Sequence, residues 1–418
     1  MRFGPLLILL IFTVCVAGFA VATATPDPVY RIASGSMAPA LLGPHYPLTC
    51  EQCQFSTALD AVDLPERVTC PNCGFQENLV DASKVRPGYG LIWEPIEPDQ
   101  LKRWDIVLLE NAEAQTWQVK RVAFLPGETP RIDQGELYRG EQLIRKSPQE
   151  REALKQLVFD QSYAPPENPR FRSDQPTGSG WNVRRGSLGF APIGDTQANN
   201  NDWVVYDHHR CLPPPSPVDH AASPLDSYGY NHSVSRELFP IFDLWMEFTC
   251  EHWQAQGLTI RLQGNDDRST IEVDLAQGIV RGISPEQTTE LPLSIDSLDG
   301  MTVRAGECDG AMFLELHHDR RHWYFPLGNA DTQFGSQPFA IKIGDGQAIL
   351  RHVKIYRDIV WLGRQRRPTP WSFDRELGPD EIFVLGDNVP ISDDSRFELG
   401  PVDVRKNLRG KVLRVLAD

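Results

Sequence analysis

The stretch EIFVLGDNVPISDDSR, from Glu381 to Arg396, decides which fold is expected of this chain. Its first five residues are mostly apolar and predict a β-strand, which runs into the turn Gly386-Asp387-Asn388. A serine and several charged residues follow at close spacing, up to Arg396. Two stretches much earlier in the chain contain further candidate residues and are interpreted together with this one: SGSMAP from Ser34 and WQVKRV from Trp117.

Ser36 and Lys120 are the first candidate catalytic residues. A serine hydroxyl needs a base to take its proton, and no histidine lies in a motif such as Gly-x-Ser-x-Gly. A lysine can be that base only when neutral, which requires an apolar setting that lowers its pKa. On a strand, the side chain of Lys120 faces opposite to those of Val119 and Arg121, so it can face a core while Arg121 reaches water. Taken singly, a serine of this kind usually belongs to a turn and such a lysine to a solvated face.

Four blocks of sequence give the pair its context. They are Ser-x-Ser-Met-x-Pro from Ser34, Arg-x-Asp-Ile-Val from Arg103, Val-Lys-Arg-Val-x-x-Leu-Pro-Gly from Val119, and Gly-Asp-Asn with Ser-x-Asp-Ser-Arg from Gly386. In this order they resemble the sequence boxes of bacterial type I signal peptidases, over roughly a third of the chain.

The resemblance implies roles for individual residues. Ser36 becomes the nucleophile and Lys120 the general base. The hydroxyl of Ser34 joins the backbone N–H of Ser36 in an oxyanion hole, and Ser392 hydrogen-bonds Lys120.

The resemblance also implies supporting residues. Asp394 and Arg396 form an ion pair near the site, with Arg121 as a further partner of Asp394. Ile32 and Val119 match positions that line substrate pockets for small residues, although plain core packing explains them equally well. The chain departs from the family at Trp104, where glycine is common, at Ala40, and at Val389-Pro390.

The N-terminal segment, residues 1–26, is expected to be a transmembrane anchor, because Leu6 to Ala22 is almost wholly apolar. Sparse positive charge before it favours an N-terminus in the cytoplasm. The catalytic part is then expected on the outer side of the cell membrane, which is the inner membrane where a cell has two. A cleaved secretory signal is the alternative, since Ala22-Thr23-Ala24 resembles a cleavage site. From Ala24 the chain reaches Ser36 within about 40 Å, so the nucleophile is expected close to the membrane. The net charge of −15 argues against a nucleic-acid partner.

Four cysteines fall in two tight pairs separated by sixteen residues, a spacing typical of a four-thiolate zinc ribbon: Cys50, Cys53, Cys70 and Cys73. A closed site of this kind is structural, and no cofactor is expected for catalysis. Disulfides are the alternative, because the expected topology places the segment outside the cell.

The rest of the chain is expected to form insertions. Alternating segments such as Leu244 to Phe248 and Phe339 to Ile343 predict an antiparallel β-sandwich, similar to a jelly roll. Residues Pro148 to Phe159 are expected to form a helix, and Ala164 to Tyr230, rich in Pro, Gly, Asn and Ser, an irregular covering loop. The sandwich is interpreted either as binding a glycan or a protein ligand, or as a structural cover.

The expected fold is therefore mainly β. The units are an anchor at 1–26, a signal-peptidase-like core at 27–48, 79–128 and 371–418, a zinc-ribbon-like insertion at 49–78, a loop-rich insertion at 129–237 and the sandwich at 238–370. The leading functional hypothesis is a membrane-bound endopeptidase acting on preproteins that carry signal peptides. The alternatives are a specialised Ser-Lys processing protease and a non-catalytic surface protein that binds partners through the ribbon and the sandwich.

Overall fold

The computed structural model describes residues 29–63, 65–111, 116–175, 177–193, 202–213, 220–264, 268–317, 321–327 and 333–417. The expected anchor, residues 1–26, lies outside these ranges. Within them, no helix is long and apolar enough to cross a membrane. The described chain is mainly β, with six sheets and two short α-helices, α1 (Pro148–Leu154) and α2 (Val404–Asn407).

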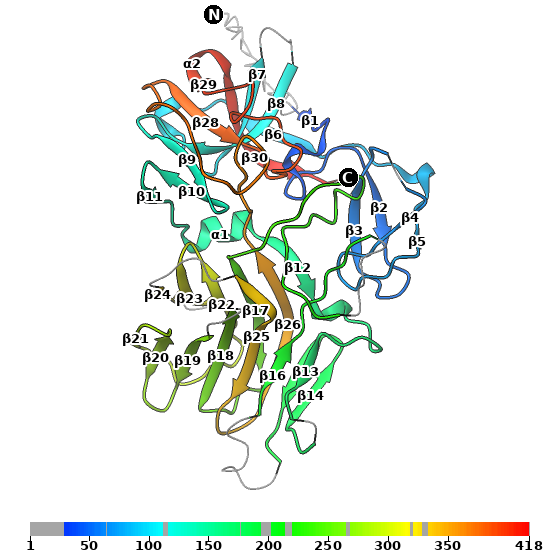
Figure 1. The fold of residues 1–418 in the computed structure, drawn as a ribbon, viewed down its shortest axis with the longest axis vertical. Helices are drawn as coiled ribbons and strands as arrows, with labels where there is room; N and C mark the ends of the chain where they lie inside the picture. Colours follow the sequence, from blue (N-terminus) through cyan, green and yellow to red (C-terminus); the bar gives the residue numbers. More distant parts are fainter. Residues whose placement is uncertain are drawn as a thin grey trace, which may run out of the picture.

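A seven-stranded sheet at the top of Figure 1 holds the candidate site. Its strands follow the order β1 (Val29–Arg31), β6 (Gly90–Glu94), β30 (Leu408–Leu416), β7 (Ile106–Asn111), β8 (Thr116–Phe124), β28 (Glu381–Leu385) and β29 (Val402–Asp403). The last strand expected from the sequence is thus confirmed as β28. In the antiparallel register, Val107 lies opposite Lys120 and Leu385 lies opposite Arg121. The strand pairing therefore brings the turn after Leu385 beside Lys120.

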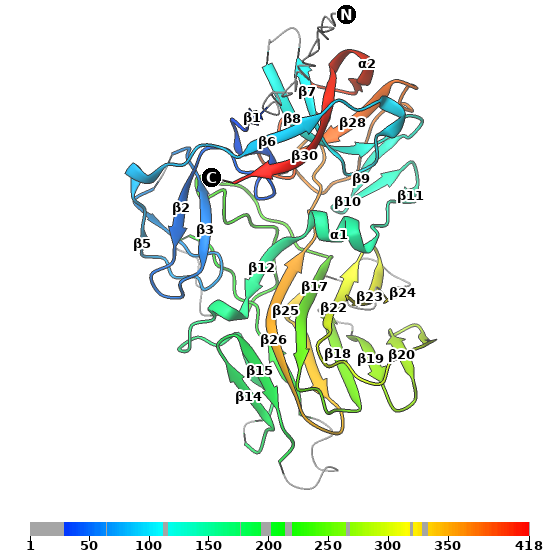
Figure 2. The ribbon, with the colours of Figure 1, turned by 180° about the vertical axis from the view of Figure 1, so that it is seen from behind.

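Two further sheets form a sandwich in the lower half of Figures 1 and 2. One contains β14 (Trp181–Arg184), β15 (Ser187–Phe190), β26 (Ala348–Arg357), β17 (Leu244–Glu251), β22 (Thr302–Cys308), β23 (Ala311–Leu316) and β24 (Arg321–Pro326), with β12 (Gln156–Asp160) paired to β26. The other contains β13 (Phe171–Ser173), β16 (Val204–Tyr206), β25 (Phe334–Ile343), β18 (Gly257–Gly264), β19 (Arg268–Asp274), β20 (Ile279–Ile283) and β21 (Thr288–Pro292).

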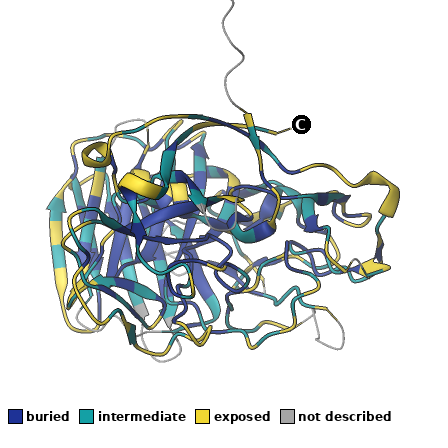
Figure 3. Cartoon of the chain, turned by 90° about the horizontal axis from the view of Figure 1, so that it is seen from above, coloured by how far each residue is buried: buried dark blue, intermediate teal, exposed yellow. Residues whose placement is uncertain are grey.

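A single apolar core joins these two sheets. Alternate residues such as Phe248, Ile260, Ile341 and Ile355 point inward from both sheets and are fully buried. Figure 3 shows this burial from above, with dark blue strands inside and yellow segments at the periphery. The period of two in the sequence is the pattern that such inward-facing positions require.

The structure corrects two expectations about the insertion. Helix α1 ends at Leu154, and residues 156–160 form β12, because their backbone pairs with the edge of β26 instead of continuing the helix. The segment Ala164 to Tyr230, expected to be an irregular loop, contributes four strands, β13 to β16, to the two sheets. Their pairing with β25 and β26 supplies the order that their own sequence does not predict.

Smaller sheets complete the architecture. A four-stranded sheet of β11 (Gln142–Leu143), β10 (Glu136–Arg139), β9 (Pro130–Asp133) and β27 (Trp371–Ser372) lies between the upper sheet and the sandwich. The four-cysteine segment forms two hairpins at the side of the molecule, β2 (His45–Thr49) with β3 (Ser56–Asp60) and β4 (Arg67–Val68) with β5 (Asn78–Leu79).

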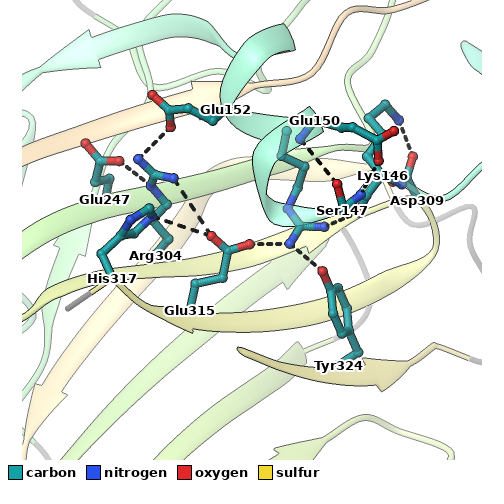
Figure 4. A network of polar contacts seen from close by, with 11 residues as sticks. Lys146, Ser147, Glu150, Glu152, Glu247, Arg304, Asp309, Glu315, His317 and Tyr324 are labelled. Atoms are coloured by element: carbon teal, nitrogen blue, oxygen red, sulfur yellow. Dashed lines mark hydrogen bonds and ion pairs between the residues drawn. The ribbon is translucent and has the colours of Figure 1, made fainter. Parts of the chain in front are cut away.

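A buried ionic cluster connects α1 and the four-stranded sheet to the sandwich. Lys146 Nζ forms ion pairs with Asp309, with Asp358 Oδ2 at 2.8 Å and with Glu136 Oε2 at 3.6 Å. Asp243 accepts hydrogen bonds from the backbone N–H of Asp309. Figure 4 shows the neighbouring part of the network, in which Lys146 reaches Asp309. One buried ammonium therefore faces four carboxyl groups.

The excess of carboxyl groups makes stability depend on pH. Burial first, and then the nearby Asp309, raise the pKa of Asp243 to about 7. Since the unfolded value is about 3.9, the folded chain holds this proton more tightly, and stability is lost as pH rises from about 4 through 7.

We expect Asp243→Asn to remove part of the loss of stability at higher pH, because the amide cannot ionise. Between pH 5 and pH 8 the melting temperature of the variant should fall less than that of the unmodified protein, by about 2–4 °C. The control is Glu94→Gln at an exposed position. Identical pH dependence of the two melting curves would contradict this interpretation of the cluster.

Candidate active site and four-cysteine cluster

The candidate nucleophile lies in a short 3-10 turn directly after β1. The turn η1 (Gly35–Met37) buries Gly35 and Met37 and leaves Ser36 half-buried. Ser34, at the N-terminal cap, donates a hydrogen bond from its hydroxyl to Ser36 Oγ at 3.3 Å. The two serines predicted from the sequence to act together are therefore in contact.

Lys120 meets this turn from the neighbouring strand β8. Its side chain is buried, and its Nζ lies 3.4 Å from Ser36 Oγ. Burial lowers the pKa of Lys120 below its ordinary value, because the ammonium form loses its hydration. The positive charge of Arg396 acts in the same direction, whereas the carboxylates of Asp394, Asp393 and Asp387 oppose the shift. The direction of the net shift is the one that a lysine base requires.

Asp394 and Arg396 form the ion pair that the resemblance implies. Both side chains are fully buried, and Arg396 Nε and NH2 each lie 2.8 Å from an oxygen of Asp394. Burial would raise the pKa of Asp394, but the charge and hydrogen bonds of Arg396 outweigh it and keep that pKa low. Asp394 also accepts the backbone N–H of Gly386 at 3.0 Å. The pair thus fixes the loop that follows β28.

Arg121 is not where the sequence placed it. Its guanidinium does not reach water and does not contact Asp394, but forms a buried bidentate pair with Asp387, at 2.7 Å from Nε and 2.5 Å from NH2. It also donates to the carbonyl of Trp104 at 2.9 Å. The expectation that Arg121 reaches water failed because both faces of β8 are covered. Alternation along this strand therefore does not separate a solvent-exposed face from a buried one.

Ser392 also departs from its expected role. Its hydroxyl is buried, and among the hydrogen bonds of the described residues none joins it to Lys120. A hydrogen bond from this hydroxyl instead helps to lower the pKa of Asp394. The hydroxyl lies instead against Gly386, where an added Cβ would meet Ser392 Oγ at 2.2 Å. Close packing of the loop thus sets the position of Ser392.

The backbone of the nucleophile turn is held by Asn388. Its side-chain amide donates to the carbonyl of Gly35 at 2.9 Å, and its backbone N–H donates to the carbonyl of Ser36 at 3.0 Å. Asn231, from the long insertion, exchanges two hydrogen bonds with the side chain of Asn388, at 2.6 and 2.7 Å. Tyr228 adds a bond from its hydroxyl to the carbonyl of Asp387 at 3.0 Å.

Sequence reasoning missed this set of hydrogen bonds made by Asn388, Asn231 and Tyr228, which we call the clamp on the nucleophile turn. Asn388 lay in a recognised block but received no role. Asn231 and Tyr228 carry no motif, since each is an isolated polar residue in a segment rich in turn residues. Homologous sequences with the same insertion would be the signal that could identify them.

An open cleft of about 450 Å³ lies over Ser36 and Lys120. Asp60, Ala61 and Val62, at the base of the β2–β3 hairpin, form one side of its lining. The remaining lining residues come from the nucleophile turn and the residues before it, the residue before β2, the strand β8 and the loop after β28: Ala33, Ser34, Gly35, Pro44, Gln118, Ile391 and Asp393. The four-cysteine segment therefore contributes to the candidate active site.

Ile32 and Val119 are both buried and belong to one apolar cluster with Met37 and Leu108. They are not among the residues that line this cleft. Their position supports core packing directly beneath the nucleophile turn, and their role toward a substrate stays a prediction.

Trp104 has a backbone conformation that is unusual for a large residue. Its φ is 72°, in the left-handed region that favours glycine. Its indole stacks on that of Trp361, with ring centroids 6.1 Å apart and an interplanar angle of 20°. Burial of the large ring in this core offsets the backbone strain.

The four cysteines of the ribbon lie close together and are buried. Cys50 Sγ lies 3.7 Å from Cys73 Sγ, and Cys53 Sγ lies 3.7 Å from Cys70 Sγ. Ligands at about 2.3 Å from a tetrahedral zinc ion would lie about 3.8 Å apart, whereas sulfurs in a disulfide lie about 2.05 Å apart. The cluster can therefore hold a metal ion, and its spacing is that of thiolate ligands.

Comparison with known proteins gives no family. No model of a protein family matches the chain, and no curated protein matches it. Solved structures match parts of it at low similarity. The carbohydrate-binding module CBM66 from Bacillus subtilis matches with a TM-score of 0.28 and 11% identity, over 44% of this chain and 94% of that one. The galectin LEC-6 of Caenorhabditis elegans matches with a TM-score of 0.22 and 13% identity, over 28% and 87%. A double mutant of congerin II matches with a TM-score of 0.22 and 15% identity, over 28% and 92%.

We expect Gly386→Ala to destabilise the site. An added Cβ would lie 2.2 Å from Ser392 Oγ and 2.6 Å from the carbonyl oxygen of Ser36, and the backbone oxygen cannot move without shifting the nucleophile. The cost should be about 1–3 kcal/mol in unfolding free energy, measured by denaturant titration. Gly189→Ala is the matched control, because its nearest heavy atom would lie 3.8 Å away. Equal stability of the two variants would show that the loop is loosely packed.

Proposed function

We propose that this chain is a membrane-bound serine endopeptidase similar to type I signal peptidases, which removes signal peptides from exported preproteins. The observation that carries the proposal is the buried Lys120 amine 3.4 Å from the hydroxyl of Ser36, at an open cleft. A serine and a lysine at this separation, with the pKa of the lysine lowered, are the parts that a Ser-Lys hydrolase needs.

The reaction proceeds through an acyl-enzyme. Neutral Lys120 takes the proton of Ser36 as Oγ bonds to the carbonyl carbon of the scissile peptide. The oxyanion is held by the backbone N–H of Ser36 and the hydroxyl of Ser34. When the C–N bond breaks, the Lys120 ammonium gives its proton to the leaving amine. Water, deprotonated by Lys120, then hydrolyses the ester of Ser36 and restores both groups.

The location proposed for this activity is the outer surface of the inner membrane, with residues 1–26 as a single anchor and the N-terminus in the cytoplasm. The first described strand, β1, carries Tyr30, which stacks on Trp117 at 5.9 Å, and Trp93 packs edge-on against the same indole at 5.8 Å. Trp117 is 38% exposed. Aromatic side chains of this kind favour the membrane–water interface, which is where a signal peptide presents its cleavage site.

The ribbon is proposed to hold a structural zinc ion through Cys50, Cys53, Cys70 and Cys73. Four thiolates close the coordination sphere, so the metal would fix the fold of the two hairpins and leave no position for a substrate. Catalysis itself is assigned to protein groups alone.

We expect Ser36→Ala and Lys120→Met each to reduce cleavage of a membrane-inserted preprotein by at least about a thousandfold, because neither half of the dyad works without the other. Cleavage is measured as the shift from precursor to mature form in detergent or lipid vesicles. Lys84→Met, at an exposed lysine, is the control and should keep full activity. Full activity of either dyad variant would refute the assignment, and no cleavage by the unmodified protein would favour a non-catalytic binding protein.

The pH dependence of kcat/KM provides a second test. Only the neutral amine of Lys120 is active, so activity should rise with pH and level off below the ordinary lysine pKa of 10.5. Asp393 carries a charge that favours the ammonium form. Asp393→Asn should therefore move the rising limb to lower pH, whereas Asp99→Asn, on the exposed turn η3 (Pro98–Gln100), should leave it in place. A limb that Asp393→Asn does not move, or moves upward, would argue against Lys120 as the titrating base.

A further inference from the structure

Arg170 is a buried cation without an acidic partner. Its side chain lies directly before β13 and is 1% exposed. NH2 donates to the carbonyl oxygen of Cys73 at 3.0 Å and lies 3.8 Å from Cys211 Sγ. Nε and NH1 have no hydrogen-bond partner within the described part of the chain. No ion pair between Arg170 and a described carboxylate compensates its charge.

Two buried arginines near the candidate site are arranged differently: Arg396 is matched by Asp394 and Arg121 by Asp387, each through two short contacts. Arg357, which is also buried, donates from two nitrogens to backbone carbonyls and lies over the ring of Tyr228, whereas Nε and NH1 of Arg170 have no partner in the described part of the chain. Removing a guanidinium from water costs several kcal/mol unless a negative charge faces it. A neutral carbonyl and a neutral thiol do not provide that charge. The described surroundings of Arg170 therefore lack a negative charge that would compensate its guanidinium.

The four-cysteine cluster can provide the missing charge. Four thiolates carry four negative charges and a divalent metal ion two positive ones, so the closed centre has two negative charges in excess. Arg170 donates to the backbone of one of its four ligands, Cys73, and therefore lies next to the centre. Two disulfides formed from the same cysteines would be neutral and would leave the guanidinium unmatched.

We infer that Arg170 is the fixed counter-charge of a divalent metal–tetrathiolate centre, and that the ribbon holds a metal ion rather than two disulfides. The inference rests on the metal site proposed above and is independent of the protease activity. Arg170 acts as a positioning residue, since it stabilises the thiolate form of the ligands without coordinating the metal.

The same contact docks the ribbon on the sandwich. Asn72, between two of the ligands, donates to the carbonyls of Asp160 and Tyr163 at 3.3 and 3.4 Å and accepts the backbone N–H of Asp160 at 2.7 Å. Arg185, an exposed arginine, donates to the carbonyl of Cys53. With Arg170 at the centre of this contact, metal binding and docking stabilise one another.

The test compares Arg170→Met, Arg170→Lys and, as a control at an exposed arginine, Arg184→Met in the full chain. Each protein is stripped of metal under reducing conditions and titrated with Co²⁺, whose absorption spectrum reports tetrahedral thiolate coordination, and Zn²⁺ affinity is then measured by competition. We expect Arg170→Met to weaken metal binding at least about tenfold, because a buried charge is lost close to the thiolates. Arg170→Lys should recover part of the affinity. Arg184→Met should change it less than about threefold, because this exposed guanidinium donates to Asn182, outside the contact with the ribbon, and its charge is screened by solvent.

Unchanged affinity in a folded Arg170→Met protein would overturn the role of Arg170. If that variant does not fold, the unmodified protein still decides the chemical form of the centre. One metal ion per chain and four thiols that react only after chelation support the inference. Two disulfides, or absence of metal from protein purified with reduced cysteines, would refute the metal site itself.

Discussion

The candidate site depends on keeping one lysine out of water. Lys120 lies on a strand covered on both faces, so its ammonium form would have to be desolvated at a cost of several kcal/mol. Two neighbouring carboxylates are matched by arginines, Asp387 by Arg121 and Asp394 by Arg396, and the desolvation of Lys120 outweighs the remaining pull of the carboxylates toward its ammonium form. The amine can then stay neutral beside a serine, which is the condition on which the proposed chemistry rests.

The insertions take part in the site rather than extend from it. The ribbon supplies Asp60 to Val62 to the cleft, and the insertion supplies Asn231 to the clamp on the nucleophile turn. Tyr230 packs so close to Gly35 that an added Cβ there would lie 2.6 Å from its ring. Parts of the chain that lie outside the family resemblance thus set the shape of the candidate active site.

Much of the fold and part of the site could be predicted from the sequence, for physical reasons. Strand β17 alternates between buried and partly exposed residues from Met246 to Glu251, and the period of two in its sequence shows this directly. Strands β13 to β16 are short and gain their order from partners far along the chain, so local composition misrepresents them. The four cysteines were found because their spacing reflects the chemistry of a thiolate site, whereas Ser36 and Lys120 were proposed from the resemblance of four sequence blocks to a known family. The partner of Arg121 and the absence of a bond from Ser392 to Lys120 depend on packing in three dimensions, which no local pattern records.

The clamp on the nucleophile turn also has a consequence for synthesis. Ser36 is among the first of the described residues to be made, but the amide that fixes its backbone belongs to residue 388, and the partner of that amide to residue 231. A nascent chain therefore carries Ser36 through most of translation without the support that orients it. Full assembly of the candidate site has to wait until nearly all of the printed sequence has been synthesised.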